Sequence, residues 1–155
     1  MKGVGRRGAL AGLVGGLTGL LVQLLLRGAF NIGPRLTDLM PDLFKPLAGS
    51  DILIFAAFIL LESVVAGFLY AQSHDRLPGN VWLKGLSFGA ILWLVVNILP
   101  LLGASAMLDL PPIEIITGWS LLWLFFIEIQ ILATALAYLG LTRLSKKCNR
   151  TDCGN

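Results

Sequence analysis

The sequence predicts an all-α membrane protein, a bundle of four transmembrane helices. Of its 155 residues, 56% are hydrophobic and 14% are charged, whereas a soluble domain carries about 25% charged residues. The mean hydropathy is correspondingly high, at +0.82. Crossing a bilayer core of about 30 Å takes about 20 helical residues, and four apolar stretches reach that length. They lie near residues 8–26, 52–72, 84–102 and 119–142.

The first stretch carries glycines that cluster on one helical face, at about 100° per residue. Gln23 and Arg27 continue the same stripe. Small residues spaced four apart allow two helix backbones to approach closely, and such packing drives helix association in lipid. We therefore predict that this helix forms the closely packed seam of the bundle, with Gln23 turned inward. The packing glycines are Gly8, Gly12, Gly15, Gly16 and Gly19.

The connections contain turn and cap signals. In residues 28–50, Pro41 and Pro46 preclude one long helix, and apolar residues at helical spacing predict short amphipathic turns on the outer membrane surface or over the bundle. Ser50-Asp51 is the predicted N-cap of the second helix. Pro78-Gly79-Asn80 is predicted to turn the chain and to cap the third helix.

The third helix contains Asn97 followed by Pro100. This proline is expected to kink the outer end of the helix and to free a carbonyl that neighbouring helices must satisfy. Pro111-Pro112 is predicted to begin the approach to the fourth helix. Aromatic side chains favour membrane interfaces. We expect an inner belt and an outer one, formed by Tyr70, Trp82 and Tyr138 and by Trp119.

The basic residues predict the orientation of the chain. Nine of the twelve lie in the N-terminal tail, the second loop and the C-terminal tail, so the positive-inside rule places both termini in the cytoplasm. We expect residues 1–145 to form one transmembrane domain in a bacterial-type inner (plasma) membrane, followed by a polar cytoplasmic tail over residues 146–155. The lipid bilayer is the first expected partner. No basic face is large enough to follow phosphates, which argues against nucleic acid.

Two glutamates interrupt the apolar helices. Glu62 and Glu128 lie about ten residues inside the outer ends of the second and fourth helices, at a depth of about 15 Å. A charged side chain costs about 2.5–3.5 kcal/mol there and usually faces a protein interior. We predict that both face inward and form a polar column with Asn97 and Gln23. Helical spacing places Phe55, Ile59, Ala66 and Leu69 on the stripe of Glu62, and Leu121 and Ala135 on that of Glu128.

The two carboxylates allow two interpretations. If they lie close together they share a proton, because both are not easily charged in a low dielectric, and this state suits proton or cation handling. Otherwise each is neutral and forms a hydrogen bond to an amide, to the hydroxyl of Ser63 or Thr134, or to a backbone carbonyl. Such a bond latches two helices by about 0.6–2 kcal/mol.

Other site chemistries find little support in the sequence. His74, the single histidine, is predicted to be a solvated loop residue, and one histidine cannot provide bis-histidine haem ligation. Cys148 and Cys153 lie in the predicted cytoplasmic tail, where a disulfide is disfavoured, and they have no neighbouring histidine with which to complete a zinc site. Phosphate-loop, zinc-protease and nucleophile-elbow motifs do not occur. We therefore predict no metal, no cofactor and no catalytic residue.

The sequence also suggests a tandem repeat of a two-helix unit. Arg7-Gly8 with Gly12 opens the first helix, and Lys84-Gly85 with Gly89 opens the third. Each helix that follows carries a glutamate near its middle and then a tyrosine. A duplicated unit of this kind would give two parallel halves.

About the last two-thirds of the chain also carries a resemblance to a known family. KGLSFGAILWLVVNILPLLG, with the following Leu110-Pro111 and the last span, resembles the third and fourth spans of the YagU-like bacterial inner-membrane proteins, and LLESVVAGFLYA resembles their second span. The resemblance implies a four-helix inner-membrane protein. It implies no particular activity, because the family has no settled biochemical function and a link to acid stress has been suggested for one member only. Those proteins generally have a histidine where Glu62 and Glu128 stand, so an acid here replaces a base or ligand.

Three functions are compatible with these features. The first is a non-enzymatic subunit or assembly factor that packs against a larger membrane complex or against itself. The alternative is a proton- or cation-linked transporter or channel component that uses Glu62 and Glu128. The third is a membrane-embedded enzyme acting on a lipid or quinone, because two carboxylates can serve as acid and base.

Overall fold

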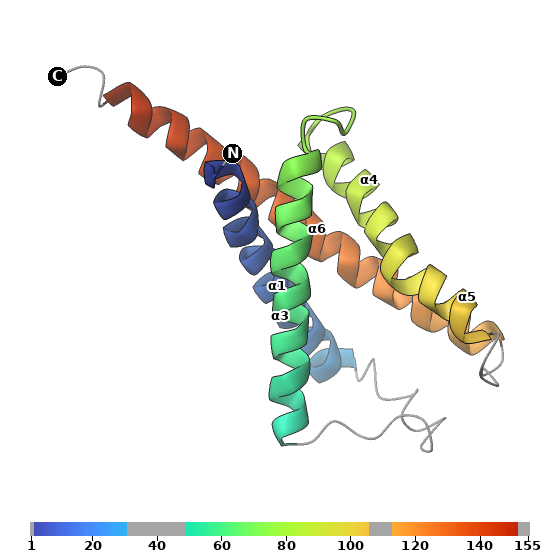
Figure 1. The fold of residues 1–155 in the computed structure, drawn as a ribbon. Helices are drawn as coiled ribbons and strands as arrows, with labels where there is room; N and C mark the ends of the chain where they lie inside the picture. Colours follow the sequence, from blue (N-terminus) through green and yellow to red (C-terminus); the bar gives the residue numbers. More distant parts are fainter. Residues whose placement is uncertain (1, 31–48, 106–112, 152–155) are drawn as a thin grey trace.

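The computed structural model describes residues 2–30, 49–105 and 113–151, and it is helical almost throughout these ranges. No strand occurs among the described residues. Helix α1 covers Lys2–Phe30, α3 covers Ser50–Ser73 and α4 covers Val81–Trp93. A short π-helix, η1, at Leu94–Ile98 joins α4 to α5 at Leu99–Ser105, and the chain ends with α6 at Ile113–Thr151. Figure 1 shows their order along the chain.

Four helical segments are long and apolar enough to cross a membrane. They include the predicted stretches and extend a few residues beyond each, which confirms an all-α four-helix bundle and fits a small integral membrane protein. α6 continues as a helix to Thr151, so no helix end separates residues 1–145 from the predicted tail. The segments are Gly3–Leu26, Ser50–Ser73, Val81–Ala104 and Ile116–Lys146.

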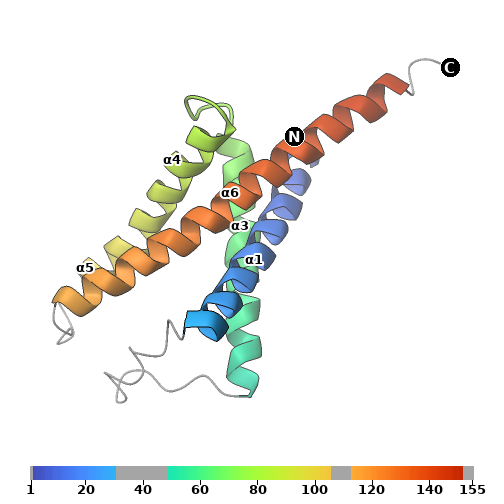
Figure 2. The same ribbon diagram turned by 180° about the vertical axis from the view of Figure 1, so that it is seen from behind.

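The helices form an open arrangement with α1 between α3 and α6. α1 packs extensively against both, α4 packs along α6, and α3 meets α6 over a shorter stretch. α6 crosses the other helices obliquely and its C-terminal part projects beyond them, whereas α3 and α4 come together at the loop that joins them, as the two opposite views show (Figures 1 and 2). We refer to the end that holds the loop of residues 74–80 as the loop end.

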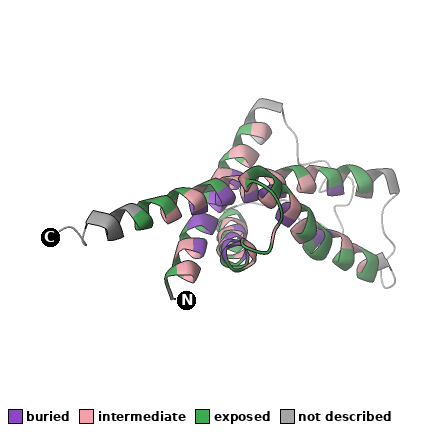
Figure 3. Cartoon of the chain, turned by 90° about the horizontal axis from the view of Figure 1, so that it is seen from above, coloured by how far each residue is buried: buried purple, intermediate pink, exposed green. Residues whose placement is uncertain are grey.

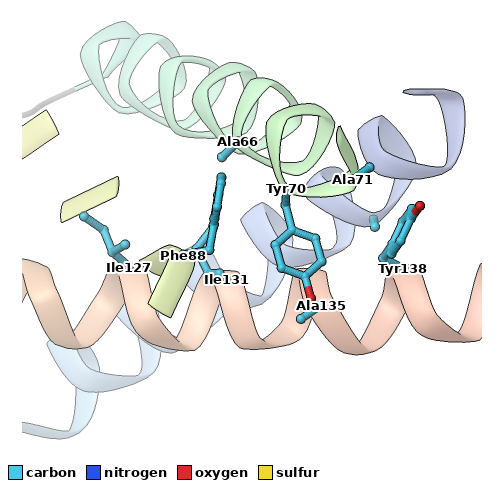
Figure 4. Close-up of a cluster of buried hydrophobic side chains, with 9 residues drawn as sticks. Ala66, Tyr70, Ala71, Phe88, Ile127, Ile131, Ala135 and Tyr138 are labelled. Atoms are coloured by element: carbon cyan, nitrogen blue, oxygen red, sulfur yellow. The ribbon is translucent and has the colours of Figure 1, made fainter. Parts of the chain in front are cut away.

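The buried core lies where the helices cross (Figure 3). Side chains from α3, α4 and α6 interdigitate there, and Ala11 contributes from α1 (Figure 4). Tyr70 is fully buried at the centre and Tyr138 is 7% exposed, so the prediction that they belong to an interfacial belt was wrong. The buried cluster comprises Ala11, Ala66, Tyr70, Ala71, Phe88, Ile127, Ile131, Ala135 and Tyr138.

The third span is irregular near its middle. Pro100 has no N–H to donate to the carbonyl four residues earlier. The chain forms a π-turn just before it, in which the N–H of Leu99 donates to the carbonyl of Leu94. π-turns within α-helices are rare and are frequent at functional positions. The irregularity expected at Pro100 is therefore a local change of helix type on its N-terminal side.

The loop end confirms one predicted turn and corrects one predicted cap. Gly79 has a φ of 85°, a conformation that glycine adopts at little cost, and the side chain of Asn80 accepts a hydrogen bond from the N–H of Leu83 at 3.0 Å. At α3 the N-cap is Gly49, one residue before the predicted Ser50-Asp51. The predicted amphipathic turns, and Pro111-Pro112, lie outside the described residues.

Candidate functional site

The glycine stripe of α1 meets α3 along one of its flanks. A methyl group on Gly8 would lie 2.5 Å from the Cβ of Ala71 and 2.6 Å from the carbonyl oxygen of Gly67. One on Gly12 would meet the carbonyl oxygen of Ser63, and one on Gly16 would lie 2.6 Å from its Oγ. Gly67 supplies the matching small residue on α3. The two backbones therefore touch, as a small-residue stripe permits.

The remaining two glycines of the stripe face α6. A methyl group on Gly15 would meet the side chain of Thr134 and the carbonyl of Gln130, and one on Gly19 would lie 3.3 Å from the Oε1 of Gln130. α1 thus has small residues on two flanks. It is wedged between two helices, whereas a helix with one glycine face contacts only one partner closely.

A hydrogen bond joins α3 to α6 beside this wedge. The side-chain amide of Gln130 donates to the hydroxyl of Ser63 at 2.5 Å, and that hydroxyl donates in turn to the carbonyl of Ile59. Ser63 is buried. An interhelical hydrogen bond of the predicted kind therefore joins α3 to α6, but its donor is Gln130 and not one of the two glutamates. Gln130 was not predicted as a site residue, although an amide two positions after Glu128 on a different helical face was a readable signal.

Glu128 packs against the backbone of α4. A methyl group on Gly89 would lie 2.6 Å from its Oε2 and 3.0 Å from its Oε1. The Oε2 atom is buried and has no hydrogen-bond partner among the described residues. A buried unpaired acceptor costs about 1–3 kcal/mol. The small surface of Gly89 is what allows the carboxyl group to lie in the α4–α6 interface.

Glu62 lies at the edge of the inward face of α3. It is half-buried, and its carboxylate makes no hydrogen bond or ion pair within the described ranges. α3 and α6 run in the same direction, and Ser63 is bonded to Gln130. Glu62 and Glu128, which precede these residues by one and two positions, therefore lie at similar depth.

A second polar contact joins the third span to α6. The hydroxyl of Ser120 donates to the Oδ1 of Asn97 at 2.6 Å, and the indole of Trp93 donates to the carbonyl of Ser120 at 2.9 Å. Asn97 lies in the π-turn and is buried. The irregular turn therefore points an amide into the α6 interface. Ser120 was not predicted, because an isolated serine in an apolar helix carries no strong signal.

The predicted polar column is thus divided among separate contacts. Asn97 meets Ser120, Glu128 meets Gly89, and Gln130 meets Ser63. Glu128 and Gln130 lie on different flanks of α6, because two residues are about 200° apart around a helix. Gln23 is half-buried, one turn beyond Gly19. In the parts of the chain that the structure covers, no hydrogen bond links Gln23, Glu62 and Glu128 to one another.

The predicted stripes were also partly wrong. Leu69 and Leu121, placed on the inward faces of α3 and α6, are 45% and 56% exposed. Residues spaced by seven drift by about 20° per step around an ideal helix. Ala135 is consequently buried, Glu128 lies at the border and Leu121 lies outside the inward face.

His74 forms a polar and aromatic junction at the loop end. Its Nδ1 is 3.2 Å from the hydroxyl of Tyr70, and its ring centroid is 5.3 Å from that of Tyr138, with the two rings tilted by 59°. Its carbonyl accepts a hydrogen bond from Lys84 at 2.7 Å. Burial and the Lys84 ammonium lower the pKa of His74 from 6.5, with Asp75 acting in the opposite direction. The predicted solvated loop residue therefore connects three helices.

Within the described ranges, no three histidine, cysteine, aspartate or glutamate side chains come together as a metal site would require. Comparisons with family models, curated proteins and solved structures find no match for this chain. Fold and contacts therefore carry the functional argument alone.

Proposed function

We propose that the protein is a small subunit or assembly factor that packs against a larger membrane complex or against itself, and catalyses no reaction. The observation that carries this proposal is the use of its polar groups. Hydrogen bonds between helices use the side chains of Gln130, Ser63, Asn97 and Ser120. The glycines of α1 make close contacts with the neighbouring helices. Interhelical polar contacts and small-residue stripes are what hold membrane helices together.

The distribution of basic residues supports an orientation with both termini in the cytoplasm of a bacterial-type inner membrane. The N-terminus and the loop of residues 74–80 lie toward the same end of the molecule (Figure 1), as that orientation requires. Membership of the YagU-like proteins stays a prediction.

Co-purification from membranes in a mild detergent tests this role. A tagged chain is expected to retain defined membrane-protein partners or further copies of itself, because helix packing survives gentle extraction. Membranes from cells with an untagged chain are the control. A chain that elutes alone and as a monomer would count against the proposal.

A second candidate function is a proton- or cation-linked component of a transporter or channel. The observation that favours it is the buried Oε2 of Glu128, which has no hydrogen-bond partner in the described residues. A carboxyl group without a donor is available to take up a proton or a cation. Intramembrane carboxylates are enriched on ion and proton paths, and Glu62 lies at similar depth.

Glutamine variants separate the two functions. Glu62→Gln and Glu128→Gln, alone and together, keep a hydrogen-bonding group but cannot titrate. An ion site is expected to lose pH-driven flux in reconstituted vesicles, whereas a packing role tolerates both changes. Asp75→Asn is the matched control, because Asp75 is an exposed acid in the loop and its replacement should leave the flux unchanged. Flux equal to that of the parent chain in the double variant would exclude the ion function.

A further inference from the structure

The buried faces of α3 and α6 repeat in one register. A spacing of 68 residues relates Ile59 to Ile127 and Tyr70 to Tyr138, and every buried position between them obeys the same spacing. The two tyrosines meet edge to face at 6.0 Å. The intermediate pairs are Ser63 with Ile131, Ala66 with Thr134, and Gly67 with Ala135.

This register relates Glu62 to Gln130, not to Glu128. Gln130 lies on the flank of α6 that α1 covers. The corresponding flank of α3 carries Glu62 and faces away from α1. No helix covers this flank in the described residues, because α3 and α4 meet mainly where Tyr70 contacts Phe88. A packing flank in the second half of the chain is therefore an open flank in the first half.

The residues of α4 explain the difference. A spacing of 77 residues relates Gly8 and Gly12 to Gly85 and Gly89, which pack on α6. The same spacing relates Gly15 and Gly19 of α1, which admit α6, to Leu92 and Val96. These larger side chains keep a second helix from approaching the α4 backbone as closely as glycine allows.

The open flank of α3 has the spacing of a helix-packing seam. Phe58, Val65 and Leu69 are 60%, 51% and 45% exposed, and together with Glu62 they follow each other at intervals of four, three and four residues. This is the a/d spacing of left-handed helix pairs. Glu62, at the centre of this seam, is the one residue there that can form a strong hydrogen bond.

We propose that the seam of Phe58, Glu62, Val65 and Leu69 binds the same seam of a second copy of this chain. The proposal rests on the self-packing form of the proposed function. Two copies share one orientation in the membrane, so a two-fold axis along the membrane normal brings Glu62 to its counterpart at the same depth. One carboxyl group then carries a proton and donates to the other, a short and strong kind of hydrogen bond. A second copy supplies this complement without any further protein.

Cysteine cross-linking in liposomes tests the geometry of the seam. The purified full-length chain carries Cys148→Ser and Cys153→Ser, with a single cysteine introduced in turn as Phe58→Cys or Val65→Cys. Both are expected to form intermolecular disulfides, which require Cα atoms within about 7 Å. Leu53→Cys and Ala57→Cys are the controls and should stay reduced, because both residues are exposed and point away from the seam at about 100° per residue.

Dilution of the protein in liposomes, followed by energy transfer between labelled copies, measures the strength of the pair. Glu62→Leu is expected to raise the dissociation constant about 3- to 30-fold, the contribution of one interhelical hydrogen bond. Glu62→Gln should lie within about threefold of the parent because an amide pair also forms hydrogen bonds. Leu53→Ala, on the opposite side of α3, should match the parent.

A monomeric chain, or disulfides at the control positions as readily as in the seam, would overturn this inference. Equal dissociation constants for Glu62→Leu and the parent would do the same. The cross-linking pattern decides the matter independently if Glu62→Leu fails to fold. None of these results removes the role of a subunit in another complex, which co-purification tests separately.

Discussion

At the junction of α3 and α4, His74 shows how much one residue can depend on its surroundings. Its ring is held between Tyr70 and Tyr138, and its carbonyl holds Lys84. Each contact comes from a different helix. A charge on this ring would lie partly out of water and near a cation, which is why the neutral form is favoured in the folded chain.

The free energy of unfolding is therefore expected to decrease as the pH is lowered through the range in which His74 titrates. The unfolded chain takes up its proton near pH 6.5, but the folded chain does so only at a lower pH. The contribution is thus fully present above pH 6.5 and is lost as the pH falls toward the folded pKa. Thermal unfolding in detergent, compared between the parent and His74→Gln, measures it.

The His74→Gln variant should show a shallower loss of stability below pH 6.5. Asp75→Asn is a useful companion, because removing that carboxylate should lower the pKa of His74 further. Identical pH profiles for His74→Gln and the parent would show that the junction does not couple to folding.

At the scale of single elements, α1 differs from every other helix in the described structure by having two flanks of glycine. Gly8, Gly12 and Gly16 admit α3, and Gly15 and Gly19 admit α6. Leucines such as Leu17 and Leu24 cover its remaining surface and are more than half exposed, as lipid-facing side chains are. The small glycine flanks of α1 therefore set the distance between α3 and α6.

Gly12→Leu is expected to destabilise the fold by at least about 1–3 kcal/mol, the usual cost of overpacking. The added side chain meets the backbone of Ser63, which cannot move aside as a flexible side chain can. Unfolding in detergent, followed by helical circular dichroism, measures this loss. Gly140→Leu is the matched control, since nothing lies near Gly140. Equal stability of the two variants would mean that α1 is not closely packed against α3.

Across the whole molecule, α1 packs extensively on α6, whereas few polar and aromatic contacts join the pair α1–α3 to the pair α4–α6. The bond from Gln130 to Ser63 crosses from the second pair to the first, and the rings of Tyr70, Phe88 and Tyr138 form the other junction. Most of the remaining contact between the pairs comes from α1 against α6. The hydrogen bond and the aromatic junction are therefore the contacts between the pairs that single substitutions can test one at a time.

A double-mutant cycle on Ser63→Ala and Gln130→Leu measures one of these junctions. The coupling energy is expected to be about 0.6–2 kcal/mol, as for other hydrogen bonds between membrane helices. Thr18→Val serves as the control, because the hydroxyl of Thr18 donates to the carbonyl of Val14 in its own helix. Additive effects of the two substitutions would show that the bond does not hold the halves together.

Hydropathy and length were enough to predict the four spans. A long apolar segment in lipid must satisfy its backbone N–H and C=O groups internally, and the α-helix does so within a single segment. The glycine stripe of α1 was readable for the same kind of reason. The pairing of flanks was not readable, since it depends on which neighbour each helix meets. Glu62 and Glu128 lie at the edges of their inward faces, where a few degrees of rotation decide between burial and exposure.

The position of α1 has a consequence for how the chain is made. α1 is synthesised before α6, so Gly15 and Gly19 have no packing partner until Gln130 and Thr134 of α6 have been made. Until then this flank of α1 faces lipid or the insertion machinery. A nascent chain that has not yet reached α6 therefore leaves one glycine flank of α1 uncovered, and synthesis of α6 is the step that covers it.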